Sequence, residues 1–393
     1  MVRLHGECLS RSYPLSAPQR TVMRHIATCR TAALGGHVDH CDGCGHQRLS
    51  YNSCRDRHCP KCQGTQRAAW LEKRLQRLLP APYFHVVFTL PEELNQILLR
   101  NKRRGYAILF AAAAQTLQQI AADPHRLGAE IAITAVLHTW GQSLRFHPHL
   151  HCVVTGGGLS SDGQRWIEGR EDYFLPVRVL AKLFRGKFLA ALDEARQQDQ
   201  LDLGGRCADL ANATAWAALR HQLYQKDWIV YAKPPFGGPE VVFRYLGRYT
   251  HRVAISNHRL VSLVDGQVTF TVKDYADGNR KKTMTLGAEQ FLRRFLLHVL
   301  PLRFVRIRHY GLVAGRNVGT KLAAARQLLE TSASRCQRSS DAQLLRDQEP
   351  KVDPNVCPGC GQPLRRRAIL PDVAHRYTAN LARASPTWQE EAA

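Results

Sequence analysis

The 393-residue sequence lacks three features, and each absence narrows the classes of protein that it can encode. Its longest uninterrupted apolar run, Tyr106–Ala114, is far too short to span a bilayer, which argues against a membrane protein. The first residues, MVRLHGE, contain no apolar core of a signal peptide, so we expect a cytoplasmic protein. A Gly-x-x-x-x-Gly-Lys-Ser/Thr loop is also missing, since Gly315–Lys321 departs from that pattern, and this excludes a recognisable P-loop helicase.

Acidic residues are scarce as well. The chain has 32 Asp and Glu against 55 Lys and Arg, which gives a formal net charge of +23. Such an excess concentrates polyanions near the surface by electrostatic steering, so nucleic acid is the expected partner. A hydrophobic content of 44% is enough for two or three domains with real cores.

The twelve cysteines indicate metal binding, because disulfides are rare in a reducing compartment. Two Cys-x-x-Cys knuckles, Cys41 with Cys44 and Cys59 with Cys62, are separated by fourteen residues. This spacing predicts one tetrahedral structural zinc site with four thiolate ligands. Paired redox cysteines would need a thioredoxin-like βαβ context, which is absent. Five further residues could bind a second ion or support the first: Cys29, His37, His40, Cys54 and His58.

A histidine-rich stretch, Arg145–Thr155, has the pattern of a β-strand that ends at the glycines 156–158. Because side chains alternate along a strand, His147, His149 and His151 fall on one face. His149 and His151 could therefore hold one divalent cation between them. The alternative is an ordinary sheet surface lined by polar histidines.

A second stretch, Glu240–Arg252, contains two tyrosines with helical spacing. Tyr245 and Tyr249 stand at i and i+4, so a helix would carry both phenols on one face. A neighbouring basic stripe is expected to contact DNA: Arg244, Arg248 and Arg252. The alternative is an aromatic stripe packed into a core. Phenols flanked by arginines suit phosphodiester chemistry, which needs a hydroxyl nucleophile and cations for the phosphate.

Together these stretches resemble a known family. The sequences FHPHLHCVVTGGGL and YLGRYTHRVAISNHRL, with the cysteine-rich start, are similar to the two-tyrosine rolling-circle transposases of bacterial insertion sequences, in the HUH endonuclease superfamily. The resemblance covers roughly residues 20 to 315. It implies an α+β chain with a zinc-binding domain at 1–80 and an HUH domain at 81–315, built on an antiparallel ferredoxin-like or RNA-recognition-like sheet.

The last segment, 316–393, is expected to be a linker and a tail that holds a lone knuckle, Cys357 and Cys360. A single knuckle is half a zinc site, and Cys336 and His375 are two candidates to complete it.

The resemblance also implies a chemistry. Tyr245 and Tyr249 would be nucleophiles that form a 5′-phosphotyrosine, and His149 and His151 would hold Mg²⁺ or Mn²⁺. The substrate would be single-stranded DNA at transposon ends and target, in the nucleoid, with strand separation left to a host helicase, the replication machinery or supercoiling. A third metal ligand stays open among four residues: Gln142, His147, Glu240 and His251.

Two other functions compete with transposition. A plasmid or phage replication initiator, or a relaxase, would share the chemistry, but the zinc-binding start and the YLGRYTHR sequence favour a transposase. A non-catalytic zinc-containing nucleic-acid-binding protein could use the tyrosines to stack bases. That second function explains the charge and the cysteines, but not paired histidines together with paired tyrosines.

Overall fold

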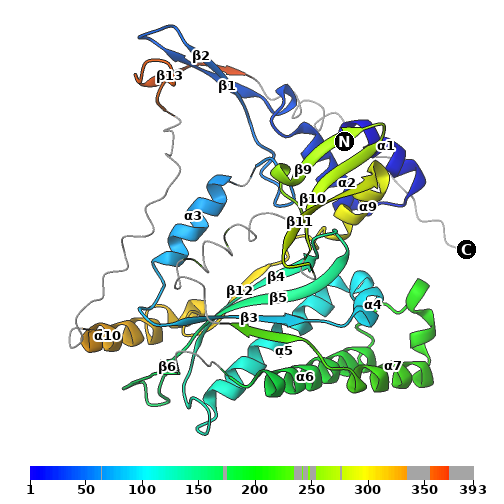
Figure 1. Cartoon of the computed structure of the whole chain (residues 1–393), viewed down its shortest axis with the longest axis vertical. Helices are drawn as coiled ribbons and strands as arrows, with labels where there is room; N and C mark the ends of the chain where they lie inside the picture. Colours follow the sequence, from blue (N-terminus) through cyan, green and yellow to red (C-terminus); the bar gives the residue numbers. More distant parts are fainter. Residues whose placement is uncertain are drawn as a thin grey trace, which may run out of the picture. The chain divides into compact units, whose positions relative to one another are not determined.

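The computed structural model in Figure 1 describes residues 1–62, 64–170, 175–233, 241, 247, 254–274, 277–333 and 355–370. The chain divides into two compact units. The first contains the described residues up to 62 together with 355–370, and the second contains those from 64 to 333.

The second unit is built on a five-stranded antiparallel sheet of order β12-β4-β5-β3-β8. Its strands are β3 (Tyr83–Thr89), β4 (Ala132–Trp140), β5 (Phe146–Thr155), β8 (Val230–Lys233) and β12 (Ile307–Gly311). Helix α5 (Lys102–Ala122) connects β3 to β4, and α6 (Val177–Gln197) and α7 (Ala213–Gln225) lie between β5 and β8. Without β12, this is the β-α-β-β-α-β arrangement of ferredoxin-like folds. The predicted antiparallel sheet with the histidines on its central strand is confirmed.

Strand alternation gives the sheet two different faces. On β5, Leu150, Cys152 and Val154 are buried in the main core. Helices α5 and α6 cover this face (Figure 1), and they contribute Phe110 and Phe184 to the same core. Residues one position out of phase therefore point to the opposite face.

That opposite face carries His149, His151 and Val153. Helix α3 (Gly64–Leu75) and the turn after it pack on its apolar part. The residues in this smaller cluster are Trp70, Leu71, Leu75, Leu78, Tyr83, Val136, Val153 and Ile307. The histidines lie on this same face, next to Val136 and Val153 of the cluster that α3 covers.

The remaining elements of the second unit lie around this sheet. They include a three-stranded meander of β9 (Leu260–Val264), β10 (Gln267–Asp274) and β11 (Arg280–Gly287). Phe291 of α9 (Ala288–Leu297) packs edge-on against Phe270 of β10 at 5.4 Å between ring centroids. Further described helices and strands of this unit are α4 (Asn95–Arg100), β6 (Gly158–Leu159), β7 (Trp166–Ile167) and α10 (Lys321–Ala333).

The first unit contains α1 (Val2–Ser12), α2 (Ala17–Thr28) and a sheet of order β13-β1-β2. Strands β1 (Gly36–Cys41) and β2 (Gln47–Tyr51) form a hairpin, and β13 (Leu364–Leu370) adds to its other edge (Figure 1). Residues 355–370 are thus part of the amino-terminal unit, which differs from the predicted division at 80 and 315. A sequence pattern shows that a strand exists, but not which strand it pairs with.

Within the described ranges, no helix combines the length and the apolar character that a membrane crossing requires.

Candidate functional site

Three histidines converge on one face of the central strands β4 and β5. His149 and His151 lie on β5 and His138 lies opposite His149 on β4, with ring nitrogens all within 4.8 Å of one another. The Nε2 atoms of His149 and His151 are 3.0 Å apart. The structure thus brings the predicted pair together and adds a third imidazole from the neighbouring strand.

The outer nitrogens of the pair have partners that orient the rings. The Nδ1–H of His149 donates to the backbone oxygen of His147 at 2.7 Å, which leaves the Nε2 lone pair facing the cluster. The Nδ1 of His151 lies 2.8 Å from Nε2 of His85 on β3. Such hydrogen bonds fix the tautomer and orientation of metal-binding histidines.

The cluster is electrically neutral at physiological pH. Burial lowers the pKa of His149 and of His85 to about 4. Burial, with repulsion from the neighbouring histidines, also holds the pKa of His138 and His151 well below the ordinary value. Neutral imidazoles carry free lone pairs, so these rings fit a divalent metal ion.

His138 was not among the four predicted candidates for the third ligand. Of these, Gln142 and His147 are described, and neither joins the histidine group. Glu240 and His251 lie outside the described residues. The sequence signal for His138 is a single histidine near the end of an apolar strand, and only the strand register places it beside His149.

The predicted nucleophiles Tyr245 and Tyr249 lie outside the described residues, as do Arg244, Arg248 and Arg252. Two residues of this segment, Val241 and Gly247, are described, and both are helical. Gly247 is buried, and a Cβ at this position would lie 3.5 Å from Cδ1 of Leu71 on α3. Gly247 is therefore next to the helix that covers the histidine face.

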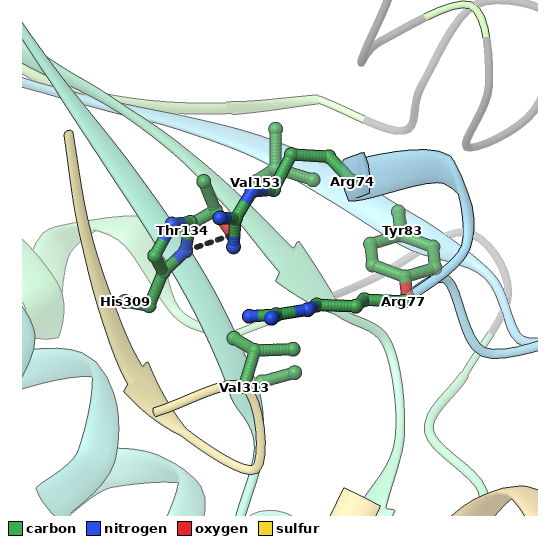
Figure 2. A pocket seen from close by; sticks show the side chains of 8 residues that line it. Arg74, Arg77, Tyr83, Thr134, Val153, His309 and Val313 are labelled. Atoms are coloured by element: carbon green, nitrogen blue, oxygen red, sulfur yellow. Dashed lines mark hydrogen bonds between the residues drawn. The ribbon is translucent and has the colours of Figure 1, made fainter. Parts of the chain in front are cut away.

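A cationic pocket continues this face along the strands (Figure 2). It is lined by Arg74, Arg77, Tyr83, Ala132, Thr134, Val153, His309 and Val313. Val153 is two positions beyond His151 on β5, and Thr134 of β4 pairs with Val153. His309 Nδ1 lies 3.1 Å from Thr134 Oγ1, and Figure 2 shows both guanidinium groups directed toward this pair. With two arginines and no carboxylate in its lining, the pocket suits an anion.

The cysteines form two clusters, and the predicted grouping of Cys41, Cys44, Cys59 and Cys62 is wrong. One cluster contains Cys29, Cys54, Cys59 and Cys62. The other contains Cys41, Cys44, Cys357 and Cys360. A knuckle fixes two thiols by local backbone geometry, whereas the tertiary fold chooses the pair that faces it. Here each amino-terminal knuckle faces a different pair.

The three histidines proposed as extra zinc ligands pair with carboxylates instead. His37 lies 3.4 Å from Asp39, His40 lies 3.3 Å from Asp42, and His58 Nδ1 lies 2.9 Å from Asp56. Burial alone would raise the pKa of Asp56, but hydrogen bonds with His58 and His25 outweigh it and hold this pKa well below its usual range. Among the described residues, the histidines of this unit thus support the cysteine clusters without joining them.

Comparisons with known proteins agree with this combination of sites. Residues 1–90 match a family described as "Transposase zinc-binding domain", and residues 132–321 match one described as "Putative transposase". The second match contains His138, His149 and His151 as well as the tyrosine segment.

Two relatives cover most of the chain. "Putative transposase y4qJ" from Sinorhizobium fredii is 51% identical over 364 residues, which are 92% of each chain. The "Transposase for insertion sequence element IS801" from Pseudomonas savastanoi pv. phaseolicola is 28% identical over 79% of this chain and 73% of the relative. No solved structure gives a significant match. The chain therefore belongs to the bacterial insertion-sequence transposases of the IS91 and IS801 type, and it carries their amino-terminal zinc-binding domain.

Proposed function

We propose that this transposase nicks and rejoins single-stranded DNA through a 5′-phosphotyrosine and so moves an insertion sequence by a rolling-circle route in the bacterial nucleoid. The observation that carries the proposal is the convergence of three neutral imidazoles on a ferredoxin-like sheet. The helical Gly247, from the middle of the two-tyrosine segment, lies beside the helix that covers the same face.

His138, His149 and His151 would hold the divalent ion, with His85 and the His147 carbonyl orienting two of the rings. An all-imidazole set suits Mn²⁺ better than Mg²⁺, because Mg²⁺ prefers oxygen ligands. When bound, the ion would polarise a non-bridging oxygen of the scissile phosphate.

The tyrosines would carry the covalent step. The Oη of Tyr245 or Tyr249 attacks phosphorus, the bond from phosphorus to the 3′ oxygen breaks, and the proton lost by the phenol is balanced by one gained at the 3′-hydroxyl. The energy of the phosphodiester bond is kept in the phosphotyrosine bond, so rejoining the strand needs no nucleoside triphosphate. With two tyrosines, one can hold the donor strand while the other receives the target strand.

The cationic pocket gives the strand a place to bind. Arg74 and Arg77 lie on the histidine face without a carboxylate in the pocket lining. Burial and the neighbouring Arg77 lower the pKa of Arg74, which means that a bound anion would relieve an unfavourable environment. We infer that a backbone phosphate near the scissile one binds against these two guanidinium groups.

The cluster of Cys29, Cys54, Cys59 and Cys62 would hold a structural zinc ion. The Sγ atoms of Cys54 and Cys62 are 3.8 Å apart. Two ligands about 2.3 Å from a tetrahedral zinc ion are separated by about the same distance. The amino-terminal unit would then present a stable surface for recognising DNA ends.

The test follows a labelled single-stranded end sequence into a protein-linked band on a denaturing gel with Mn²⁺. The double variant Tyr245→Phe, Tyr249→Phe should form no adduct, because phenylalanine removes only the hydroxyls. Each single variant should still nick but fail to complete strand transfer. The matched control is Tyr224→Phe, since Tyr224 is an exposed tyrosine on α7, away from the histidine face. Adduct at the wild-type level in the double variant would refute the proposal.

A further inference from the structure

We propose that Cys41, Cys44, Cys357 and Cys360 bind a second zinc ion, which ties the carboxy-terminal segment to the amino-terminal unit. This proposal does not rest on the nicking chemistry. The matched zinc-binding domain ends at residue 90, so it contains only half of this site. The other half comes from a knuckle more than 300 residues further along, since Cys44 and Cys357 are separated by 313 positions.

The four thiols have the spacing of a metal site. The Sγ atoms of Cys41 and Cys360 are 3.4 Å apart, and those of Cys44 and Cys357 are 3.5 Å apart. A disulfide would require about 2.05 Å. Tetrahedral zinc with sulfur ligands at about 2.3 Å separates them by about 3.8 Å, so a small outward movement of each thiolate accommodates the ion.

The two knuckles have the same backbone conformation, and their sequences are CDGCG and CPGCG. Gly45 N–H donates to Cys41 O at 2.9 Å, and Gly361 N–H donates to Cys357 O at 2.9 Å. These glycines have φ values of 73° and 74°, in the left-handed region that a side chain disfavours. Each knuckle therefore presents its two thiols from a matching tight turn, as two halves of a tetrahedral site would.

The strands beside the knuckles hold them face to face. Strand β13 begins at Leu364, just after the second knuckle, and pairs with Cys41 at the end of β1. The arginines of β13 meet the acidic residues of the first knuckle and strand: Arg367 and Arg365 pair with Asp42, and Arg366 pairs with Asp39. These ion pairs and the strand pairing set the register of β13 against β1. The alignment of the two strands therefore places the two pairs of cysteines opposite each other.

The experiment measures zinc bound to the purified full-length chain by mass spectrometry of the metal and by titration of released zinc with a chromogenic chelator. All counts exclude zinc held by the histidine cluster, which is measured as the loss in the double variant His149→Ala, His151→Ala and subtracted. We expect two remaining zinc ions per wild-type chain. The double variants Cys41→Ser, Cys44→Ser and Cys357→Ser, Cys360→Ser should each retain one, and the variant combining all four changes should also retain one. The control Cys8→Ser, outside both clusters, should retain two.

A single zinc ion in the wild-type chain, or two in either double variant, would overturn the proposal. A further loss of zinc in the variant that combines all four changes would also overturn the proposal, because it would place the two knuckles in different zinc sites. Cobalt titration of the wild-type chain covers the case in which a variant fails to fold. Tetrahedral thiolate absorption should saturate at two equivalents of Co²⁺, and saturation at one would also overturn the proposal.

Discussion

Replacing His85 by leucine should weaken metal binding without removing a metal ligand. His85 lies on β3, and its Nε2 is 2.8 Å from Nδ1 of His151. With a metal ion bound at Nε2 of His151, the ring proton of His151 would be on Nδ1, and this N–H would donate to Nε2 of His85. Burial lowers the pKa of His85 to about 4, so His85 is neutral and can accept this hydrogen bond at physiological pH. Leucine offers no acceptor and leaves the Nδ1–H of His151 unpaired beside the cluster.

The expected loss follows from the role of such partners in metal sites. Removing a hydrogen-bond partner of a metal-binding histidine costs about 10–100-fold in metal affinity, or about 1.4–2.7 kcal/mol. The assay measures the initial rate of single-strand nicking as a function of Mn²⁺ concentration. The half-saturating concentration should rise by about one to two orders of magnitude in His85→Leu. The rate at saturating Mn²⁺ should change much less, because all three ligands remain.

The conservative variant His85→Gln separates this effect from a loss of packing. A glutamine carbonyl can accept the proton of His151, so His85→Gln should recover most of the metal affinity. A second control, His125→Ala, changes an exposed histidine of the loop after α5 and should leave the metal dependence as it is. An unchanged metal dependence in His85→Leu, with normal thermal stability, would refute the orienting role.

Three further predictions address the same face of the sheet. His138→Ala should abolish nicking and metal binding while His147→Ala retains both, as followed by Mn²⁺ titration; equal effects would contradict the three-histidine cluster. Changing Arg74 and Arg77 to glutamine should weaken the binding of single-stranded DNA regardless of the DNA sequence. The slope of log affinity against log salt concentration should become shallower by about 0.7 per lost phosphate contact. An unchanged slope would exclude the pocket from the DNA-binding surface. Burial, with the positive charges of Arg74 and Arg77, lowers the pKa of His309 to about 4 in the folded protein, below the unfolded value of about 6.5. The unfolded chain therefore binds more protons, and stability present above pH 6.5 is lost as the pH falls toward 4. Melting temperatures between pH 7 and 5 should fall less steeply in His309→Gln than in the wild type, and parallel curves would contradict this.

The sequence by itself determined the features that depend on local periodicity. Alternation along one strand places His149 and His151 on the same face whatever the strand packs against. The spacing within each Cys-x-x-Cys knuckle likewise fixes two thiols on one turn. The antiparallel sheet with these histidines on its central strand was predicted from the family resemblance, and its order β12-β4-β5-β3-β8 agrees with that prediction.

Only the tertiary structure decided which residues complete each site. His138 and His85 come from β4 and β3, and their nearness to His149 and His151 depends on strand register, which the sequence of β5 does not contain. The knuckles at Cys41 and Cys59 look interchangeable in sequence, yet one faces Cys29 and Cys54 and the other faces a pair near the end of the chain. Each strand or knuckle could pair with several partners that lie far away in the sequence. The packing of the whole unit decides between them, because only one set of pairings buries the apolar side chains and aligns the strands at the same time.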